Sequence, residues 1–267
     1  MYARPESLDE ALGHLADGGW TVLAGGTDFY PARVGRPLTE PVLDLSRLSE
    51  LRGVEATDDG IRIGALTTWT DIVRTELPPA FDGLKLAARE VGSIQIQNAG
   101  TVAGNLCNAS PAADGVPPLL TLDAEVELAS THGLRRLPLG AFVLGNRRTA
   151  LAPGEIVTAI HVPADATTGD SSFLKLGARK YLVISIAMVA ARLHGDEAAI
   201  AVGSCSAVAQ RLPALERDIR SGWTSADTVT PEHLAPIAPI DDIRADAGYR
   251  REAAAELIRR TMRELGR

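Results

Sequence analysis

The spacing of apolar residues alternates between the helical and the strand period from the N-terminus to Pro163. After Ser7, apolar residues recur every three or four positions until Gly18, and Glu10 is placed to complete a capping box. Similar patterns predict helices from Thr68 to Arg74 and over 81–91. Short apolar runs predict strands over 20–24, 42–45, 61–64 and 155–162, and a hairpin whose first strand is 124–129 and whose turn is 131–133. Helices and strands are therefore expected to alternate in this part.

The pattern changes at residues 164–171, where the small polar run ADATTGDS is the clearest candidate linker. We therefore expect one domain over 1–167 and a second over 168–267. Alternating residues predict an antiparallel meander of strands over 172–179, 183–193 and 197–204. A final helix is predicted, with Ala254, Leu257, Thr261 and Leu265 on one face and Arg251, Arg259 and Arg263 on a solvated face.

Two stretches rich in small residues follow predicted apolar segments. They are LAGGTDFY at 23–30 and GTVAGNLCNASPAAD at 100–114. Glycine lets the backbone approach a ligand closely, and groups of backbone N–H donors suit a phosphate or pyrophosphate. Neither stretch has the GxGxxG or Gly-Lys-Ser/Thr pattern of common nucleotide folds. Each alone could be a tight turn or a set of local hydrogen bonds, but the pair favours one ligand held between two loops.

Composition limits the class of protein. The 267 residues are 45% hydrophobic and 23% charged, as in a globular protein, and the net charge of -7 argues against nucleic acid or an anionic membrane as main partner. No apolar run reaches membrane-spanning length, and the N-terminus lacks the layout of a secretory signal, so a cytoplasmic location is expected.

Few residues offer chemistry of their own. The only cysteines, Cys107 and Cys205, cannot hold an iron–sulfur cluster, and each is expected to be a small buried thiol. The histidines show no metal-ligand spacing, so no metal site is predicted, and no nucleophile–base pair supports hydrolysis. A bound nucleotide cofactor that carries the chemistry is the remaining interpretation, and no catalytic residue is predicted.

Several ordered motifs carry a resemblance that covers nearly the whole chain. The sequence resembles the flavin-binding medium subunits of the molybdenum hydroxylases, the group that includes xanthine and carbon monoxide dehydrogenases. The motifs are LAGGTDFYPARV, GTVAGNLCNASPAADGVPPLLTLDAEVEL, NRRTALAPGEIVTAIHVP, LGARKYLVISIAMVA and PIDDIRADAGYRREAAAELIRR.

The resemblance implies an α+β fold. It consists of a PCMH-type (vanillyl-alcohol-oxidase-like) FAD-binding domain of two α/β lobes, about 1–53 and 54–167, and a C-terminal domain with a small antiparallel sheet and a helical bundle. FAD would lie between the lobes. The resemblance implies cofactor contacts for Ala24, Gly25, Gly26, Thr27 and Asp28 in the first loop, for Thr101, Val102, Ala103, Gly104 and Asn105 in the second, and for Asp114, Leu151 and Lys180. For Asp114, a helix cap before Val116 is the alternative.

Two residues depart from the family pattern. Ala103 replaces the usual glycine of the TxGGN loop, and Asn146 stands where many relatives have the tyrosine of GYRKT. Neither cofactor loop contains histidine, so the FAD is expected to be non-covalent.

The resemblance implies an electron-transfer subunit without its own substrate site. A large subunit would carry the molybdenum cofactor, a small subunit the 2Fe-2S clusters, and this chain's FAD would pass electrons to NAD or another acceptor, within a dimer of heterotrimers. The alternatives are a self-contained flavin oxidoreductase of the same fold and a flavin-free scaffold subunit.

Overall fold

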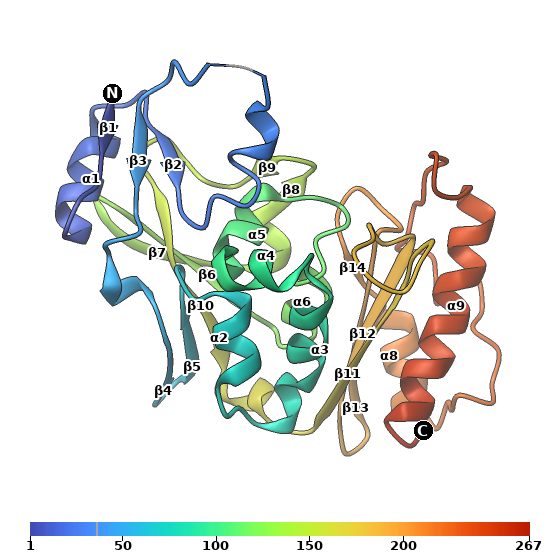
Figure 1. Cartoon of the computed structure of the whole chain (residues 1–267). Coiled ribbons are helices and arrows are strands. Elements are labelled where there is room, and N and C mark those ends of the chain that lie inside the picture. Colours follow the sequence, from blue (N-terminus) through green and yellow to red (C-terminus); the bar gives the residue numbers. More distant parts are fainter. Residues whose placement is uncertain (36) are drawn as a thin grey trace.

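A small parallel sheet forms the N-terminal part of the computed structural model, which describes residues 1–35 and 37–267. Its strand order is β1-β3-β2, with β1 at Tyr2–Ala3, β2 at Thr21–Leu23 and β3 at Val42–Asp44. Helix α1, Leu8–Ala16, packs beside it through Ala11, Leu12 and Leu15 (Figure 1). The predicted cap is present, because the Glu10 N–H donates to Ser7 Oγ at 3.2 Å, while the Glu10 carboxylate accepts from the N–H of Glu6 instead of Ser7.

A five-stranded antiparallel sheet follows, with the strand order β4-β5-β10-β6-β7. Its strands are β4 (Val54–Thr57), β5 (Gly60–Gly64), β6 (Glu125–Ser130), β7 (Gly133–Pro138) and β10 (Ile156–Pro163). The helices of this part are α2 (Trp69–Arg74), α3 (Asp82–Glu90), α4 (Ile94–Ala99), α5 (Val102–Asn108), α6 (Val116–Thr121) and α7 (Leu139–Phe142). A hairpin of β8 (Val143–Gly145) and β9 (Arg148–Thr149) lies above the sheet in the view of Figure 1.

The helices pack on one face of this sheet around the largest core. Val126 and Leu128 of β6 point into it beside Trp69 and Phe81, whereas the intervening Glu127 pairs with side chains of neighbouring strands. This alternation follows from the two-residue period of a strand. The predicted cap of α2 is confirmed as a full capping box between Thr68 and Asp71.

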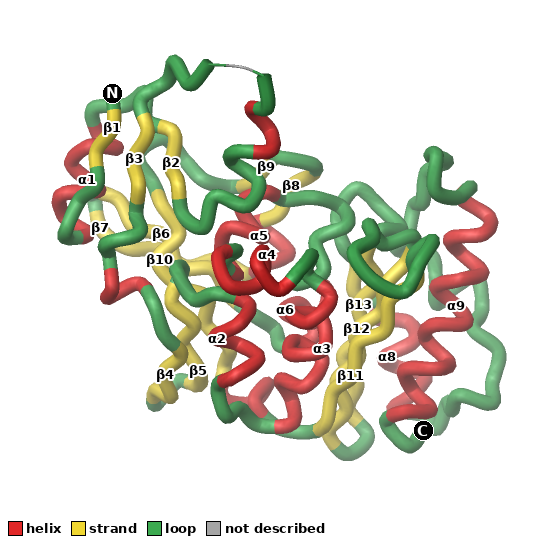
Figure 2. The backbone as a smooth tube through the Cα atoms, viewed as in Figure 1, coloured by secondary structure: helices red, strands yellow, loops and turns green. Residues whose placement is uncertain are grey.

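The C-terminal sheet lies between two layers of helices (Figure 2). Its order is β11-β12-β13-β14, with bounds Asp170–Leu176, Ala187–His194, Glu197–Gly203 and Gln210–Arg211. Helices α3 and α6 contact it from one side, and α8 (Pro213–Arg220) and α9 (Ala247–Glu264) from the other. The predicted α+β fold, with a small antiparallel sheet near the C-terminus, is confirmed. In α9, Ala254, Leu257 and Thr261 are buried and Arg251 and Arg263 are exposed, as predicted.

The C-terminal helix also carries a buried arginine. Arg250 donates to the carbonyl oxygens of Ile186 at 2.6 Å and Ser204 at 2.9 Å, and to the Asp242 carboxylate at 2.7 Å. Its side chain is only 3% exposed. Arg250 therefore ties the segment before α9 to the sheet.

Two predicted segments differ in the structure. The candidate linker 164–171 forms a 3-10 turn, Ala164–Thr167, and the first residues of β11, so it is not an open connection. The strand predicted over 183–193 begins only at Ala187. Leu182 has φ +52°, and the Arg179 guanidinium donates to its carbonyl, so the apolar residues before Ala187 form a loop. The division into domains at residue 168 stays a prediction.

No helix within residues 1–35 and 37–267 is both long enough and apolar enough to cross a bilayer.

Candidate functional site

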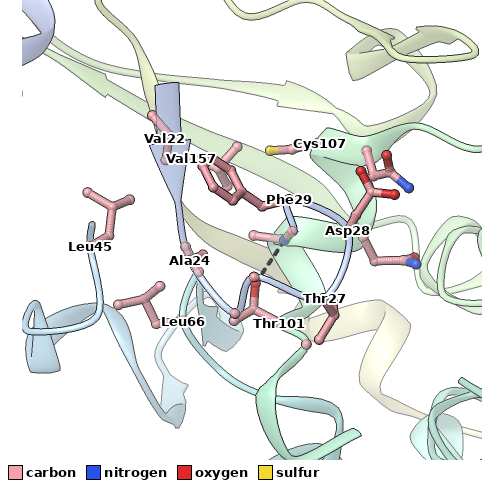
Figure 3. Close-up of a pocket in the computed structure, with 18 of the residues that line it drawn as sticks. Val22, Ala24, Thr27, Asp28, Phe29, Leu45, Leu66, Thr101, Cys107 and Val157 are labelled. Atoms are coloured by element: carbon pink, nitrogen blue, oxygen red, sulfur yellow. Dashed lines mark hydrogen bonds between the residues drawn. The ribbon is translucent and has the colours of Figure 1, made fainter. Parts of the chain in front are cut away.

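A cavity of about 470 Å³ opens between the parallel sheet and helix α5. This volume is typical of small-molecule sites, which span about 300–1,000 Å³. Figure 3 shows the loop that carries Ala24, Thr27 and Asp28 crossing in front of α5, with Thr101 beneath it. Ten of the predicted cofactor residues line this cavity: Ala24, Gly25, Gly26, Thr27, Asp28, Thr101, Ala103, Gly104, Asn105 and Leu151.

The two glycines of the first loop are required by its own packing. A Cβ on Gly25 would lie 1.9 Å from the carbonyl oxygen of Ala99, so the two predicted loops touch through their backbones. Gly26 has φ +73°, a left-handed conformation that favours glycine, and a Cβ there would lie 2.8 Å from the Tyr30 ring. Both glycines are therefore needed for the shape of the cavity wall itself, independently of any bound ligand.

The second predicted loop is in part a helix. Residues 102–108 form α5, whose first N–H groups are mostly occupied: Val102 donates to Thr67 O at 3.0 Å, Gly104 to Thr101 Oγ1 at 2.9 Å, and Asn105 to Thr101 O at 3.1 Å. Within the described chain, the Ala103 N–H has no such partner. One amide at this end of α5 is thus left for a ligand.

Two further features of α5 fit a polar ligand. The buried Oδ1 of Asn105, a residue that lines the cavity, has no hydrogen-bond partner among the described residues. Gly104 is exposed toward the cavity, and a Cβ there would meet only the Thr101 side chain, at 2.8 Å. An orphaned acceptor costs free energy when buried, which a bound donor would recover.

The ionised groups of the lining are paired. Asp28 accepts from Arg147, at 3.0 Å and 3.2 Å, while Arg33 pairs with Glu40 at 2.7 Å. Glu155 pairs with Arg135 at 2.6 Å, and this guanidinium holds the pKa of Glu155 below its ordinary value. The structure therefore offers no free carboxylate among the described lining residues.

Cys107 differs from the prediction of a small buried thiol. It is exposed and lines the cavity, although the surrounding protein desolvates it and raises its pKa to about 12. Cys205 is buried as predicted. The prediction rested on the general tendency of free cysteines to be buried, and the sequence did not show which face of α5 would carry Cys107.

Three predicted residues do not line the cavity. The Val102 side chain is fully buried in the core. Asp114 is buried and pairs with Lys175 Nζ at 2.8 Å and Ser185 Oγ at 2.9 Å, and it does not cap α6, which begins after Gly115. Lys180 is exposed in the β11–β12 loop, with its ammonium 5.2 Å from the centre of the Tyr181 ring.

Sequence reasoning missed Lys175 and Arg147. Lys175 lies two residues from the buried Phe173 on β11, so the strand period could have indicated an inward position. Arg147 pairs with a residue 119 positions away, which no local pattern indicates. No group of three or more potential metal ligands occurs in the part of the chain that the structure describes.

Comparison with known proteins gives consistent matches. A family model described as the FAD binding domain in molybdopterin dehydrogenase matches residues 1–165. A nicotinate dehydrogenase FAD-subunit from Eubacterium barkeri is 37% identical, over 68% of this chain and 64% of that protein. A glyceraldehyde dehydrogenase medium chain from Sulfolobus acidocaldarius is 32% identical, over 99% and 97% of the two chains. A carbon monoxide dehydrogenase structure from Hydrogenophaga pseudoflava superposes with a TM-score of 0.84, at 27% identity, over 99% and 96% of the chains.

Proposed function

Because this chain belongs to the family of FAD-binding domains of molybdopterin dehydrogenases, we propose that it is the electron-transfer subunit of a cytoplasmic molybdenum hydroxylase complex. It is an FAD-binding oxidoreductase subunit by family. Its FAD would receive electrons from 2Fe-2S clusters of a partner subunit and pass them to NAD or another acceptor. The observation that carries the proposal is the cavity enclosed by the 24–28 loop and α5.

The residues of this cavity fit FAD. The Ala103 N–H and the Thr101 side chain lie beside Gly104, whose missing Cβ leaves room for a phosphate oxygen, and Thr27 lines the same cavity. Asn105 Oδ1 would accept a hydrogen bond from the cofactor. Bound FAD would supply the redox chemistry, and the protein would hold and orient it without covalent attachment.

The three remaining residues proposed to contact the cofactor differ in their position relative to the cavity. Leu151 lines the cavity and would pack on the cofactor. Asp114 lies behind the wall, next to Gly115, where a Cβ would be 3.0 Å from Asn105 Oδ1, so a contact would need a change in its pairing with Lys175. Lys180 would reach the cofactor only through movement of its loop.

The partner proposal follows from what this chain lacks. Its two cysteines are the only ones in the sequence, so the clusters need another subunit. The superposed carbon monoxide dehydrogenase from Hydrogenophaga pseudoflava is a form that lacks the Mo-pyranopterin moiety of the molybdenum cofactor. We therefore propose a large molybdenum subunit and a small 2Fe-2S subunit, assembled as a dimer of heterotrimers.

Acid–base chemistry at the cavity favours this proposal over a self-contained flavin enzyme. Such an enzyme needs a proton donor near the flavin. The acids of the described lining are Asp28 and Glu155, both paired with arginines, and the pKa of Cys107 is about 12. Arginines engage both carboxylates, and the raised pKa of Cys107 keeps its proton on the thiol, so no acidic group of the described lining stands free to act as the donor.

Reconstitution tests the proposal. The purified chain should bind FAD and become yellow, and it should oxidise substrate only after the molybdenum and 2Fe-2S subunits are added. Substrate turnover by the chain with FAD alone would support the self-contained enzyme. A folded chain that takes up no FAD would support the flavin-free scaffold.

A further inference from the structure

One ion pair at the cavity joins segments far apart in the sequence. Arg147 Nη1 lies 3.0 Å from Asp28 Oδ2, and Nη2 lies 3.2 Å from Oδ1. Both residues line the cavity, Asp28 from the first loop and Arg147 from the turn between β8 and β9. Figure 1 shows this hairpin beside the loop that follows β2. Two parallel hydrogen bonds fix the relative orientation of the two segments more tightly than a single contact.

The backbone around Arg147 is specialised for this contact. Arg147 has φ +54°, which is uncommon for a long side chain, and its N–H donates to Ala109 O at 3.2 Å. Ala109 ends α5 and is itself left-handed, with φ +48°. The hairpin turn is thus anchored to the end of α5, and the arginine reaches from there to the opposite loop.

The other charged residues of the lining form ion pairs with residues much closer to them in the sequence. Arg33 binds Glu40, seven residues away, and also donates to Phe29 O at 2.9 Å. Glu155 binds Arg135, twenty residues away, and accepts from the N–H of Ala152. These pairs join residues 7 and 20 positions apart, compared with 119 positions for Asp28 and Arg147. Among the described lining residues, the ion pair between Asp28 and Arg147 joins the two parts of the lining that are farthest apart in sequence.

We infer that the Asp28–Arg147 pair is a strap that retains FAD in this cavity, an inference that rests on the proposed function. The first loop already touches the start of the second stretch, because Gly25 packs against the backbone of Ala99 and Gly100. The strap adds a second attachment of that loop, to the β8–β9 hairpin. It also neutralises Asp28, a carboxylate that would otherwise repel the phosphates of the cofactor.

The strap is a positioning device that opens and closes. The side chains of Arg147 and Asp28 are 58% and 46% exposed, so the pair is screened by salt and exchanges readily with water. Cofactor release then requires the pair to break, and high ionic strength should speed release. A buried pair would be insensitive to salt.

The test measures how fast FAD leaves the loaded chain. Wild type and the variants Arg147→Ala, Asp28→Ala and the double variant are loaded with FAD and diluted, and the rise of free-flavin fluorescence is followed. Each single variant should release FAD about two- to fivefold faster, the range expected for an exposed ion pair. The double variant should be no faster than the faster single variant, because both remove the same contact.

Arg148→Ala is the matched control. Arg148 is the next residue of the hairpin, is exposed, and makes no ion pair with any described residue. The Arg148→Ala variant loses the same positive charge as Arg147→Ala, and it should release FAD at the wild-type rate. Raising the salt concentration should speed release from wild type more than from Arg147→Ala, a difference that a merely structural role of Arg147 would not produce.

Two results would overturn the inference while leaving the proposed function intact. In the first result, the wild type would load FAD, but Arg147→Ala would release FAD as slowly as the wild type does. Alternatively, the effects of the two single variants multiply in the double variant, which would mean that each residue acts independently. A folded wild-type chain that loads no FAD would overturn the proposed function together with the strap.

Discussion

Gly104→Ala separates cofactor binding from folding. Gly104 lies inside α5, where alanine is a better helix former by about 0.5–1 kcal/mol. The new Cβ would lie 2.8 Å from Thr101 Oγ1, so this hydroxyl must shift and weaken the cap bond that it accepts from the residue 104 N–H. A lost cap costs about 0.5–2 kcal/mol, so the two effects nearly cancel. The melting temperature of the FAD-free protein should change by a few degrees at most.

Binding of FAD should change far more. Apart from Thr101, the space into which the methyl group would project is open to the cavity. A phosphate oxygen could then no longer approach the neighbouring Ala103 N–H. Loss of one charge-assisted hydrogen bond costs about 1.5–3 kcal/mol, which corresponds to a roughly 10- to 100-fold weaker Kd.

The assay is a titration of FAD-free protein with FAD, followed by quenching of flavin fluorescence, beside thermal unfolding of the FAD-free variants. Gly13→Ala is the control, because Gly13 also lies in a helix, is exposed, and would have no atom within 4 Å of its new Cβ. It should stabilise the protein and leave the Kd unchanged. A folded Gly104→Ala protein with the wild-type Kd would show that FAD does not approach this side of α5.

Four further predictions concern single side chains. Asn105→Ala should leave the melting temperature of the FAD-free protein nearly unchanged, because its buried Oδ1 has no partner there, and weaken FAD binding about tenfold in the same titration. Alkylation of Cys107, followed by mass spectrometry, should accelerate tenfold per pH unit through about pH 10 and slow when FAD is bound; a rate that levels off near pH 9 would contradict the raised pKa. Arg250→Met should lower the free energy of unfolding in urea by at least about 1–3 kcal/mol, because it leaves the carbonyl groups of Ile186 and Ser204 without this donor, while the Asp242 carboxylate keeps its hydrogen bonds from Arg244 and Ala245. Hydrogen bonds from the Arg244 N–H and from Arg250 hold the pKa of Asp242 at about 2, so its contribution to stability should be present above pH 4 and lost as the pH falls toward 2; Asp242→Asn should remove this acid-dependent loss.

Local signals in the sequence predicted much of the fold. Ser7 and Thr68 marked the starts of two helices, because their side-chain oxygens can accept a hydrogen bond from a free N–H group of the first helical turn, and apolar residues at helical spacing follow each of them. The hairpin of β6 and β7 was predicted from alternation and its glycine turn. Helix α5 was missed, because Val-Ala-Gly-Asn-Leu-Cys-Asn contains glycine, asparagine and a β-branched residue, all poor helix formers. Its only local signal was Thr101 as N-cap.

The sequence located the two main loops of the candidate site but not the individual contacts within it. The two glycine motifs were correctly brought to one cavity, but the need for Gly25 comes from Ala99, and no sequence pattern reports such an approach. Lys180 was implied by the resemblance alone, and the strand predicted over 172–179 already ends at Leu176, so Lys180 lies in the exposed β11–β12 loop. Side chains beyond that end no longer alternate, so the period could not give their direction.

The order of strands in the five-stranded sheet has a consequence for biosynthesis. The central strand, β10, is the last of the five along the chain, and it pairs with β5 on one side and β6 on the other. Until residues 156–163 have left the ribosome, β5 and β6 each have an unpaired edge, and the sheet beneath the cavity is split into two hairpins. Such non-local closure is slow compared with helix formation and exposes edges to other nascent chains. The cofactor cavity, whose lining includes Glu155, Ile156 and Val157, can therefore form only after this strand is inserted.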